Sequence, residues 1–275
     1  MPGIGVLSTI PWAPFAASFD QGLNLPAVVY RNLQDGLGYG GLANGLNHLV
    51  ADGSVTLIVA AGGLVTELAA TNSTKDYIGL VGAPPAASGR YSKGRVDLHS
   101  VANDHMHRTH LQTAHNIPFN AQCLFSNSMS AMSGQERGPA GAGAGTPWGY
   151  IANIQISEAD TPAQRQQKYA NAFTAIPANI RATIISADPF FNRYSSELVQ
   201  AANTWVNAAG TSRRVCYPLQ EYLNTAPNPA AGKTCICGPF IQQAYNYLGQ
   251  LAAHVIQPVG HPAPGNLPQP ACSDH

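Results

Sequence analysis

Short apolar runs alternate along the chain with segments that carry apolar residues at helical spacing. The clearest runs cover residues 4–8, 55–61, 77–82 and 182–185. The run 55–61 is apolar almost throughout, which is typical of a strand buried on both faces of a parallel sheet. The segment that follows it, 64–70, has a helical pattern. This alternation predicts an α/β fold built from doubly wound, Rossmann-like sheets.

The second half of the chain repeats this alternation. Further strands are predicted at residues 28–31, 121–125, 150–156 and 214–218, and further helices at 162–173, 197–206 and 239–256. A chain of 275 residues is long enough for two lobes of roughly 100 to 150 residues each. We expect an N-terminal lobe from residues 1–115 and 233–257, a C-terminal lobe from 116–232, and a Pro-rich tail, 258–275, that packs on a neighbour or forms a loose end.

Composition narrows the classes of partner. Charged residues make up only 10% of the chain, and fourteen basic residues are balanced by fourteen acidic ones. The basic residues are scattered, so the sequence lacks the electrostatic footprint that nucleic acids or anionic membranes require. We therefore expect a small molecule or another protein as the partner, and no nucleic acid.

The sequence is compatible with two compartments. It opens with Met1-Pro2-Gly3-Ile4 rather than with a basic segment and a long hydrophobic one. If a leader has been removed, the protein is periplasmic. If Met1 is the native start, it is cytoplasmic.

The cysteines are too few for a dense disulfide framework. An odd number of them leaves at least one thiol without an internal partner. Cys235 and Cys237 form a C-x-C pair, which is too tight for the usual C-x-x-C redox or zinc geometry. The pattern favours small cleft or core residues over a redox centre. The five cysteines are Cys123, Cys216, Cys235, Cys237 and Cys272.

Five of the nine histidines lie in one segment, at positions 99, 105, 107, 110 and 115. On a helix, His107 and His110 would share one face, and one interpretation is a zinc, nickel or copper site. However, the segment has no H-E-x-x-H pattern, and no nearby cysteine completes a set of four ligands. We favour a polar surface or interface helix, and we predict neither a metal nor a cofactor.

Motifs of catalysis are missing from the sequence. No serine lies in a G-x-S-x-G elbow, and there is no G-x-x-x-x-G-K-[ST] phosphate loop. The glycine-rich segment 36–41 follows a weak strand and has the wrong final spacing for a dinucleotide loop. We therefore predict that the protein is not an enzyme.

A polar and aromatic loop follows the strand predicted at residues 182–185. Its sequence is Ser186-Ala187-Asp188-Pro189-Phe190-Phe191. In open α/β folds, ligands bind at the carboxyl ends of the strands, where an aromatic ring can stack on a flat ligand and a carboxylate can hold an amine or a sugar hydroxyl. The alternative is a helix start with Pro189 in the first turn and both phenylalanines in the core.

In the order and spacing of such segments, the chain resembles the substrate-binding proteins of ABC transporters that have a type I periplasmic-binding fold. The resemblance is to the group related to aromatic amino acid and nucleoside-like binders, and it covers roughly the first 255 residues. The segments that carry it include Gly5-Val6-Leu7-Ser8, Phe19-Asp20-Gln21-Gly22-Leu23, Leu57-Ile58-Val59-Ala60-Ala61-Gly62, the Asp188 loop, and Val215-Cys216-Tyr217-Pro218.

The resemblance implies two lobes joined by a hinge, with a ligand held between them by loops at the strand ends. Glycines there let backbone N–H groups approach an acceptor on the ligand, and helix N-termini add a favourable partial charge. Cys237 is a departure, because relatives commonly carry a Ser-Tyr-Gly turn where this chain has a small thiol. The implied ligand-binding residues are Ser8, Thr9, Gly62, Gly63, Gly82, Ala83, Asp188, Phe190, Tyr217 and Cys237.

Two functions follow as hypotheses. The first is a solute-binding protein that captures a small organic molecule in an interlobe cleft for an ABC-type transporter, with a permease as its partner if the protein is exported. The second is a structural or assembly subunit of a larger complex, with a vestigial cleft. In that case the His-rich segment and the Pro-rich tail would contact the protein partners.

Overall fold

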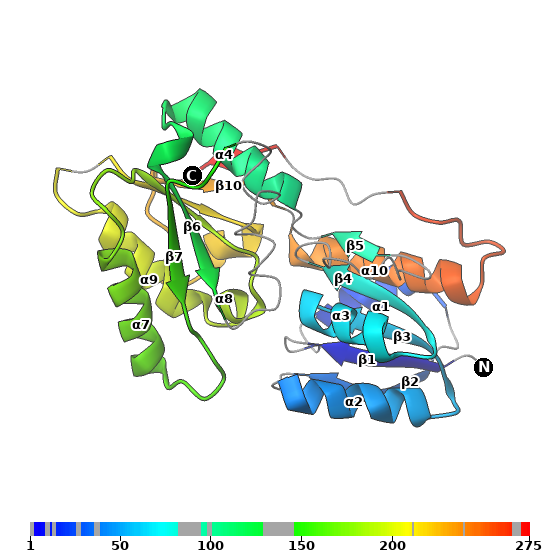
Figure 1. Cartoon of the computed structure of the whole chain (residues 1–275). Helices are drawn as coiled ribbons and strands as arrows, with labels where there is room; N and C mark the ends of the chain where they lie inside the picture. The colour runs from blue at the N-terminus through cyan, green and yellow to red at the C-terminus, as the bar shows by residue number, and fades with distance from the viewer. Residues whose placement is uncertain are drawn as a thin grey trace. The chain divides into compact units, whose positions relative to one another are not determined.

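The chain forms two compact units in the computed structural model (Figure 1). The first comprises Met1–Leu98 and Ile241–Pro268, and the second comprises His99–Phe240 and Gln269–His275. Each unit contains one sheet of mostly parallel strands, so the predicted α/β fold is confirmed. The structure describes residues 3–8, 12, 15–25, 29–35, 39–81, 95–97, 101–128, 146–210, 212–238, 240–265 and 271–275.

The first unit is built on a five-stranded sheet in the order β2-β1-β3-β4-β5. All neighbouring strands in it are parallel. The strands are β1 (Gly3–Ser8), β2 (Val29–Asp35), β3 (Val55–Ala61), β4 (Asp76–Val81) and β5 (Arg95–Asp97), and the helices are α1 (Ala16–Leu23), α2 (Tyr39–Ala51), α3 (Gly63–Asn72) and α10 (Ile241–Ile256). Helix α1 packs on α10, and α2 contacts α3. These two pairs of helices cover the sheet.

The core of the first unit follows from the apolar spacing in the sequence. Leu42, Leu46 and Leu49 recur at helical spacing along α2, and all three are buried in one cluster with Ile58 of β3. A stripe of this kind turns one side of a helix toward the sheet. Burying each such side chain stabilises the fold by roughly 1.5–3 kcal/mol.

Two glycines allow α1 and α10 to approach closely. A methyl group at Gly249 would lie 2.2 Å from the carbonyl oxygen of Phe19, and one at Gly22 would lie 1.9 Å from the carbonyl oxygen of Asn246. Both distances are too short for any side chain. Glycine is therefore required at these positions by the contact between the helices.

The second unit is built on a six-stranded sheet in the order β11-β10-β9-β8-β6-β7. Only β11 is antiparallel to its neighbour. The strands are β6 (Gln122–Asn127), β7 (Tyr150–Ile154), β8 (Ala182–Ile185), β9 (Arg214–Tyr217), β10 (Thr234–Ile236) and β11 (Ser273–Asp274), and the helices are α4 (Val101–His115), α7 (Pro162–Thr174), α8 (Pro189–Arg193) and α9 (Ser195–Val206), with 3-10 turns η2 (Phe119–Ala121) and η3 (Gln220–Asn224). Helix α7 packs on α9, whereas α4 packs on β8.

The unit boundaries differ from those predicted. Residues 99–115 and 233–240 belong to the second unit, whereas we expected 99–115 and 233–257 in the first. The reason is that β10 pairs with β9, and that α4 buries Leu111 in a cluster with Ala182 and Ile184 of β8. These long-range contacts leave no mark on the local sequence pattern.

The described end of the Pro-rich tail is part of the second sheet. Strand β11 pairs with β10, and the backbone N–H of His275 donates to the carbonyl oxygen of Thr234 at 2.8 Å. The expectation of a loose end or an arm on a neighbour is therefore wrong for residues 271–275. A strand of two residues held by backbone hydrogen bonds and a disulfide has no apolar period to detect.

Four of the five cysteines form disulfides. Cys216 and Cys235 are register partners on the adjacent strands β9 and β10, with their Cα atoms 4.5 Å apart. Cys237 is bonded to Cys272, with a Cα–Cα distance of 4.1 Å. Cys123 is the thiol left over by the odd count, and burial raises its pKa to about 12. Cys235 and Cys237 are both buried, in agreement with their interpretation as small core residues, but neither is a free thiol, because each is bonded to a cysteine distant in sequence.

Within the described part of the chain, every helix is too short or too polar to cross a lipid bilayer.

Candidate functional site

The strand order locates a candidate site in each unit. In the first sheet, β1 has β2 on one side and β3 on the other, so the direction in which successive strands are added to the sheet reverses between β1 and β3. In the second sheet, the same reversal occurs between β6 and β8. Ligands of open α/β sheets bind outside the carboxyl ends of the strands at such points. We call the β1/β3 position the first switch point and the β6/β8 position the second switch point.

The first switch point is formed by backbone groups. Ser8 ends β1, is fully buried, and lies in register with Ala61 of β3. The next residue, Gly62, has φ 130° and ψ 152°, a conformation that is essentially restricted to glycine. Gly63 begins α3. Three other predicted residues, Thr9, Gly82 and Ala83, lie outside the described residues.

Gly62 is held by three hydrogen bonds. Its N–H donates to the carbonyl oxygen of Leu80 at 2.9 Å, and its own carbonyl oxygen accepts from the N–H of Thr66 at 3.0 Å and from the Thr66 hydroxyl at 2.8 Å. These bonds fix the start of α3 at the carboxyl edge of the sheet. A helix N-terminus carries a positive partial charge and N–H donors. This edge is therefore suited to an acceptor group on a ligand.

At the second switch point, Asp188 caps α8. One carboxylate oxygen, Oδ1, accepts from the N–H groups of Phe190 at 2.8 Å and Phe191 at 3.3 Å. Pro189 occupies the first position of the helix, and Phe191 is fully buried. The helix-start interpretation of this loop is thus confirmed for Asp188, Pro189 and Phe191. Phe190, in contrast, is only partly buried.

Asn127 is a buried residue of this switch point that we did not predict. It ends β6, and its Nδ2 donates to Oδ1 of Asp188 and to the carbonyl oxygen of Ile156, both at 3.2 Å. Its Oδ1 accepts from the N–H of Ile156 at 3.2 Å. Asn127 thereby joins the loops that follow three strands. It follows an apolar run, as Ser8 does, and this shared position at a strand end is the signal that could have identified it.

An aromatic and cationic stack supports Phe190. The Phe190 ring lies parallel to that of Tyr194, with centroids 6.4 Å apart, and the guanidinium of Arg165 lies 3.7 Å from the Tyr194 centroid. Arg165 is buried, and its Nε and Nη2 donate to Oε1 of Glu197 at 3.0 and 2.9 Å. Cation–π contacts and this partly buried ion pair hold Tyr194 in place. Phe190 therefore has a fixed aromatic surface beside it.

Tyr217 and Cys237 lie at the ends of β9 and β10, and both side chains are buried. Tyr217 is 1% exposed and its ring stacks on Tyr222 at 4.6 Å, while burial raises the pKa of its hydroxyl. The sulfur of Cys237 belongs to the disulfide with Cys272.

The structure brings Ser8, Gly62 and Gly63 together at one switch point, and Asp188 and Phe190 at the other. Tyr217 and Cys237 stay predictions as ligand contacts.

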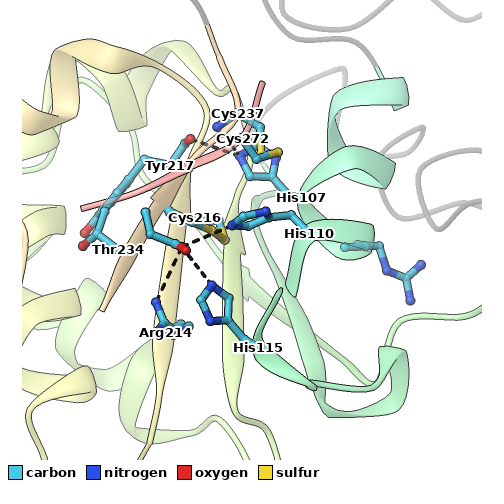
Figure 2. Close-up of a disulfide and its surroundings, with 12 residues drawn as sticks. His107, His110, His115, Arg214, Cys216, Tyr217, Thr234, Cys237 and Cys272 are labelled. Carbon is cyan, nitrogen blue, oxygen red and sulfur yellow. Dashed lines mark hydrogen bonds and ion pairs between the residues drawn. A yellow bond between two sulfur atoms is a disulfide. The ribbon is translucent and has the colours of Figure 1, made fainter. Parts of the chain in front are cut away.

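The histidine segment does not form a uniformly polar surface. His107 is fully buried, and its Nε2 lies 3.2 Å from the carbonyl oxygen of Tyr217 and 3.1 Å from the backbone nitrogen of Cys237 (Figure 2). His110 and His115 contact Asp274 of β11. Burial alone would raise the pKa of the Asp274 carboxyl, but hydrogen bonds from the two histidines outweigh burial and lower it. His99 and the side chain of His105 lie outside the described residues.

No protein-family model and no curated protein matches this sequence. Solved structures do match. The chain is similar to the ABC domain of Streptococcus pneumonia in complex with L-Trp, with 14% identity and a TM-score of 0.65, over 97% of this chain and 88% of that one. A LacI family transcriptional regulator from Bifidobacterium animalis subsp. lactis matches with 14% identity and a TM-score of 0.63, over 99% and 95% of the two chains. An ABC sugar transporter subunit from Rhodobacter sphaeroides matches with 12% identity and a TM-score of 0.62, over 99% and 98%.

At such low identity the likeness shows the fold alone. The chain has the α/β fold with two parallel sheets that type I periplasmic-binding proteins share with the ligand-binding domains of LacI regulators. This fold typically binds small ligands, in ABC transporters or in LacI regulators.

Proposed function

We propose that the protein is a non-enzymatic solute-binding protein that captures a small organic molecule for an ABC-type transporter. The observation that carries this proposal is the repeated strand order. Each sheet has a switch point, and residues predicted from the sequence as ligand contacts lie at both of them: Ser8, Gly62 and Gly63 at the first, and Asp188 and Phe190 at the second.

The chemistry of the switch points suggests the kind of solute. The first offers backbone groups and the start of α3, which suit a carboxylate or another acceptor. The second offers the partly exposed ring of Phe190, which suits a flat or unsaturated ring. Oδ1 of Asp188 already accepts three hydrogen bonds, so that atom mainly orients the loop. An aromatic amino acid or a nucleoside-like molecule has both features.

The disulfides favour a transport role over a regulatory one. Disulfides persist in oxidising compartments, including the bacterial periplasm, and are rare in the cytosol. Both of those described here join parts of the second sheet. A transcriptional regulator acts on nucleic acid, whereas the balanced charge of this chain offers no footprint for it. We therefore propose an exported, periplasmic protein with a membrane permease as its partner.

A screen of solutes tests the proposal. Oxidised protein is mixed with amino acids, nucleosides and sugars, and its Tm is measured, followed by calorimetric titration of any solute that raises it. We expect one solute per chain. Phe190→Ala should weaken its binding about tenfold, or ~1.4 kcal/mol, through the loss of ring stacking. Phe240→Ala, which truncates an exposed aromatic side chain of the same unit, is the matched control and should bind normally.

The screen also separates the two hypotheses from the sequence. If no solute stabilises the protein and it sediments as a defined oligomer, the assembly-subunit hypothesis replaces the proposal. If a solute binds but Phe190→Ala binds it as well as the unmodified chain does, the proposed use of the second switch point is wrong.

A further inference from the structure

Two imidazoles and a carboxylate converge near the C-terminal end of α4. The Nε2 atoms of His110 and His115 lie 3.2 and 2.8 Å from Oδ1 of Asp274. All three donor atoms lie within 4.8 Å of one another. Figure 2 shows both rings reaching from α4 toward the same point, to which Arg214 of β9 is also directed. Imidazole nitrogens and a carboxylate oxygen are the ligand types that zinc, copper and nickel prefer.

The cluster is assembled by the tertiary fold. Asp274 is 159 positions from His115, and it reaches α4 only because β11 is tied to β10. Asp274 is the register partner of Cys235 in that pairing, and the disulfide between Cys237 and Cys272 anchors the chain two residues earlier. A binding site whose residues are held by a helix and a tethered strand is preorganised, which lowers the cost of binding an ion.

The spacing of the donors suits one ion. Tetrahedral coordination with bonds of ~2.0–2.1 Å separates neighbouring donor atoms by about 3.4 Å. The two distances to Asp274 are 3.2 and 2.8 Å, and the imidazole rings are nearly perpendicular, at 81°. Small side-chain rotations would therefore place all three atoms around one ion.

Exposure and electrostatics also suit a cation. The side chains of His110, His115 and Asp274 are 18%, 12% and 40% exposed, so water can complete the coordination. His115 is the last residue of α4, and the C-terminal end of a helix favours positive charge. One feature opposes binding: Nη1 of Arg214 lies 3.6 Å from the same oxygen of Asp274, and it competes for that carboxylate.

We propose that His110, His115 and Asp274 bind one divalent transition-metal ion, with Zn²⁺ as the representative case. The ion would link β11 to α4, beside the Cys237–Cys272 disulfide. Hard cations such as Mg²⁺ prefer oxygen ligands and should not bind there. This site is independent of the solute-binding residues of both switch points, so its test does not depend on the proposed function.

Calorimetric titration with ZnCl2 tests the site. The full chain is used without an affinity tag, oxidised and stripped with EDTA. We expect one Zn²⁺ per chain, a higher Tm with Zn²⁺, and no response to Mg²⁺. His115→Gln and Asp274→Asn should each weaken zinc binding by about tenfold or more. His48→Gln, an exposed histidine on α2, is the control and should bind as the unmodified chain does.

Two further variants make the test sharper. Arg214→Gln should strengthen zinc binding, because it removes the cation that competes for Asp274. The double variant Cys237→Ser, Cys272→Ser should weaken it, because β11 loses its anchor. A merely structural ion pair between the histidines and Asp274 predicts neither change in zinc affinity.

The proposal is overturned if the unmodified chain does not bind Zn²⁺, or if His115→Gln and Asp274→Asn bind it as tightly as His48→Gln does. Should Asp274→Asn fail to fold by circular dichroism, the NMR signals of the imidazole rings in the unmodified chain decide. Zinc-dependent shifts at His110 and His115 support the site. Shifts confined to other histidines overturn it.

Discussion

The two sheets have the same strand order but different chemistry at their carboxyl edges. At the first switch point, the groups that we propose to bind the solute are backbone groups at the start of α3, which the hydrogen bonds of Gly62 hold in place. At the second, the buried side chains of Asn127 and Asp188 join the loops, and the ring of Phe190 is partly exposed. A site made of backbone N–H groups recognises an acceptor group on a ligand with little regard for the rest of the ligand. A site made of side chains recognises the shape of the ligand. We therefore expect selectivity among solutes to come mainly from the second unit.

Covalent links differ between the units as well. All five cysteines belong to the second unit, and four of them form disulfides next to β10 or within its pairing. The first unit relies on close helix packing instead, with Gly22 and Gly249 at the contact between α1 and α10. The second unit should therefore respond to redox conditions and the first should not.

The largest expected loss of stability comes from removing the Cys237–Cys272 disulfide, which anchors β11. The double variant Cys237→Ser, Cys272→Ser removes a disulfide that spans 35 positions, and the loss should destabilise the second unit by about 2–4 kcal/mol. The same change at Cys216 and Cys235, which span 19 positions, should cost about 0.5 kcal/mol less because the closed loop is shorter. Hydrogen exchange measured by mass spectrometry reports each unit separately.

The first unit is the internal control for this comparison. Exchange in β1, β3 and β4 should not change in either variant. Equal loosening of both units would contradict the division of stability between them. A reductant should speed hydrogen exchange less in either double variant than in the unmodified protein, because each variant has already lost one disulfide that the reductant could cleave.

A substitution at the first switch point should cause an intermediate loss of stability. Gly62→Ala places a side chain at φ 130° and ψ 152°, a conformation that costs of order 1–3 kcal/mol for an L-residue. Gly53→Ala is the matched control, because a methyl group there meets no atom within 4 Å. Urea unfolding of the two variants measures the difference. If both are equally stable, Gly62 does not hold the conformation on which the site made of backbone N–H groups depends.

The sequence predicts most of the fold because buried parallel strands carry their own signal. The run predicted at 55–61 matches β3 residue for residue, and the run at 182–185 matches β8. The alternation with helices then indicates the α/β class. The assignment of α4 and β10 to the second unit was not predictable in this way, because it depends on pairing between segments that are far apart in the chain.

The candidate site was predictable where a residue's position at a strand end determines its place. Ser8, Gly62 and Asp188 follow apolar runs, and the structure places them at the switch points. The burial of Tyr217 depends on its stacking with Tyr222, and that of Cys237 on its bond to Cys272. Neither partner can be identified from local spacing. The cluster at Asp274 depends on the same disulfide, so it could not be predicted either.

The smallest expected effect on stability comes from the second switch point. Asp188→Ala removes the acceptor for the N–H groups of Phe190 and Phe191 and for Nδ2 of Asn127. Loss of a helix cap typically costs about 1 kcal/mol. Asn127 keeps its two bonds to Ile156, so the loops should stay joined. Asp188→Asn keeps an oxygen at the capping position and should cost less, since asparagine is also a good cap.

Urea unfolding of these two variants, together with solute titration, separates the cap from the ligand contact. If Asp188 acts mainly by orienting the loop, Asp188→Ala should weaken solute binding while Asp188→Asn nearly preserves it, because only the first loses the cap. If the carboxylate charge contacts the solute, both variants should weaken binding alike while their stabilities differ. The second outcome would contradict the assignment of Asp188 as a positioning residue and would make the second switch point an electrostatic site as well as an aromatic one.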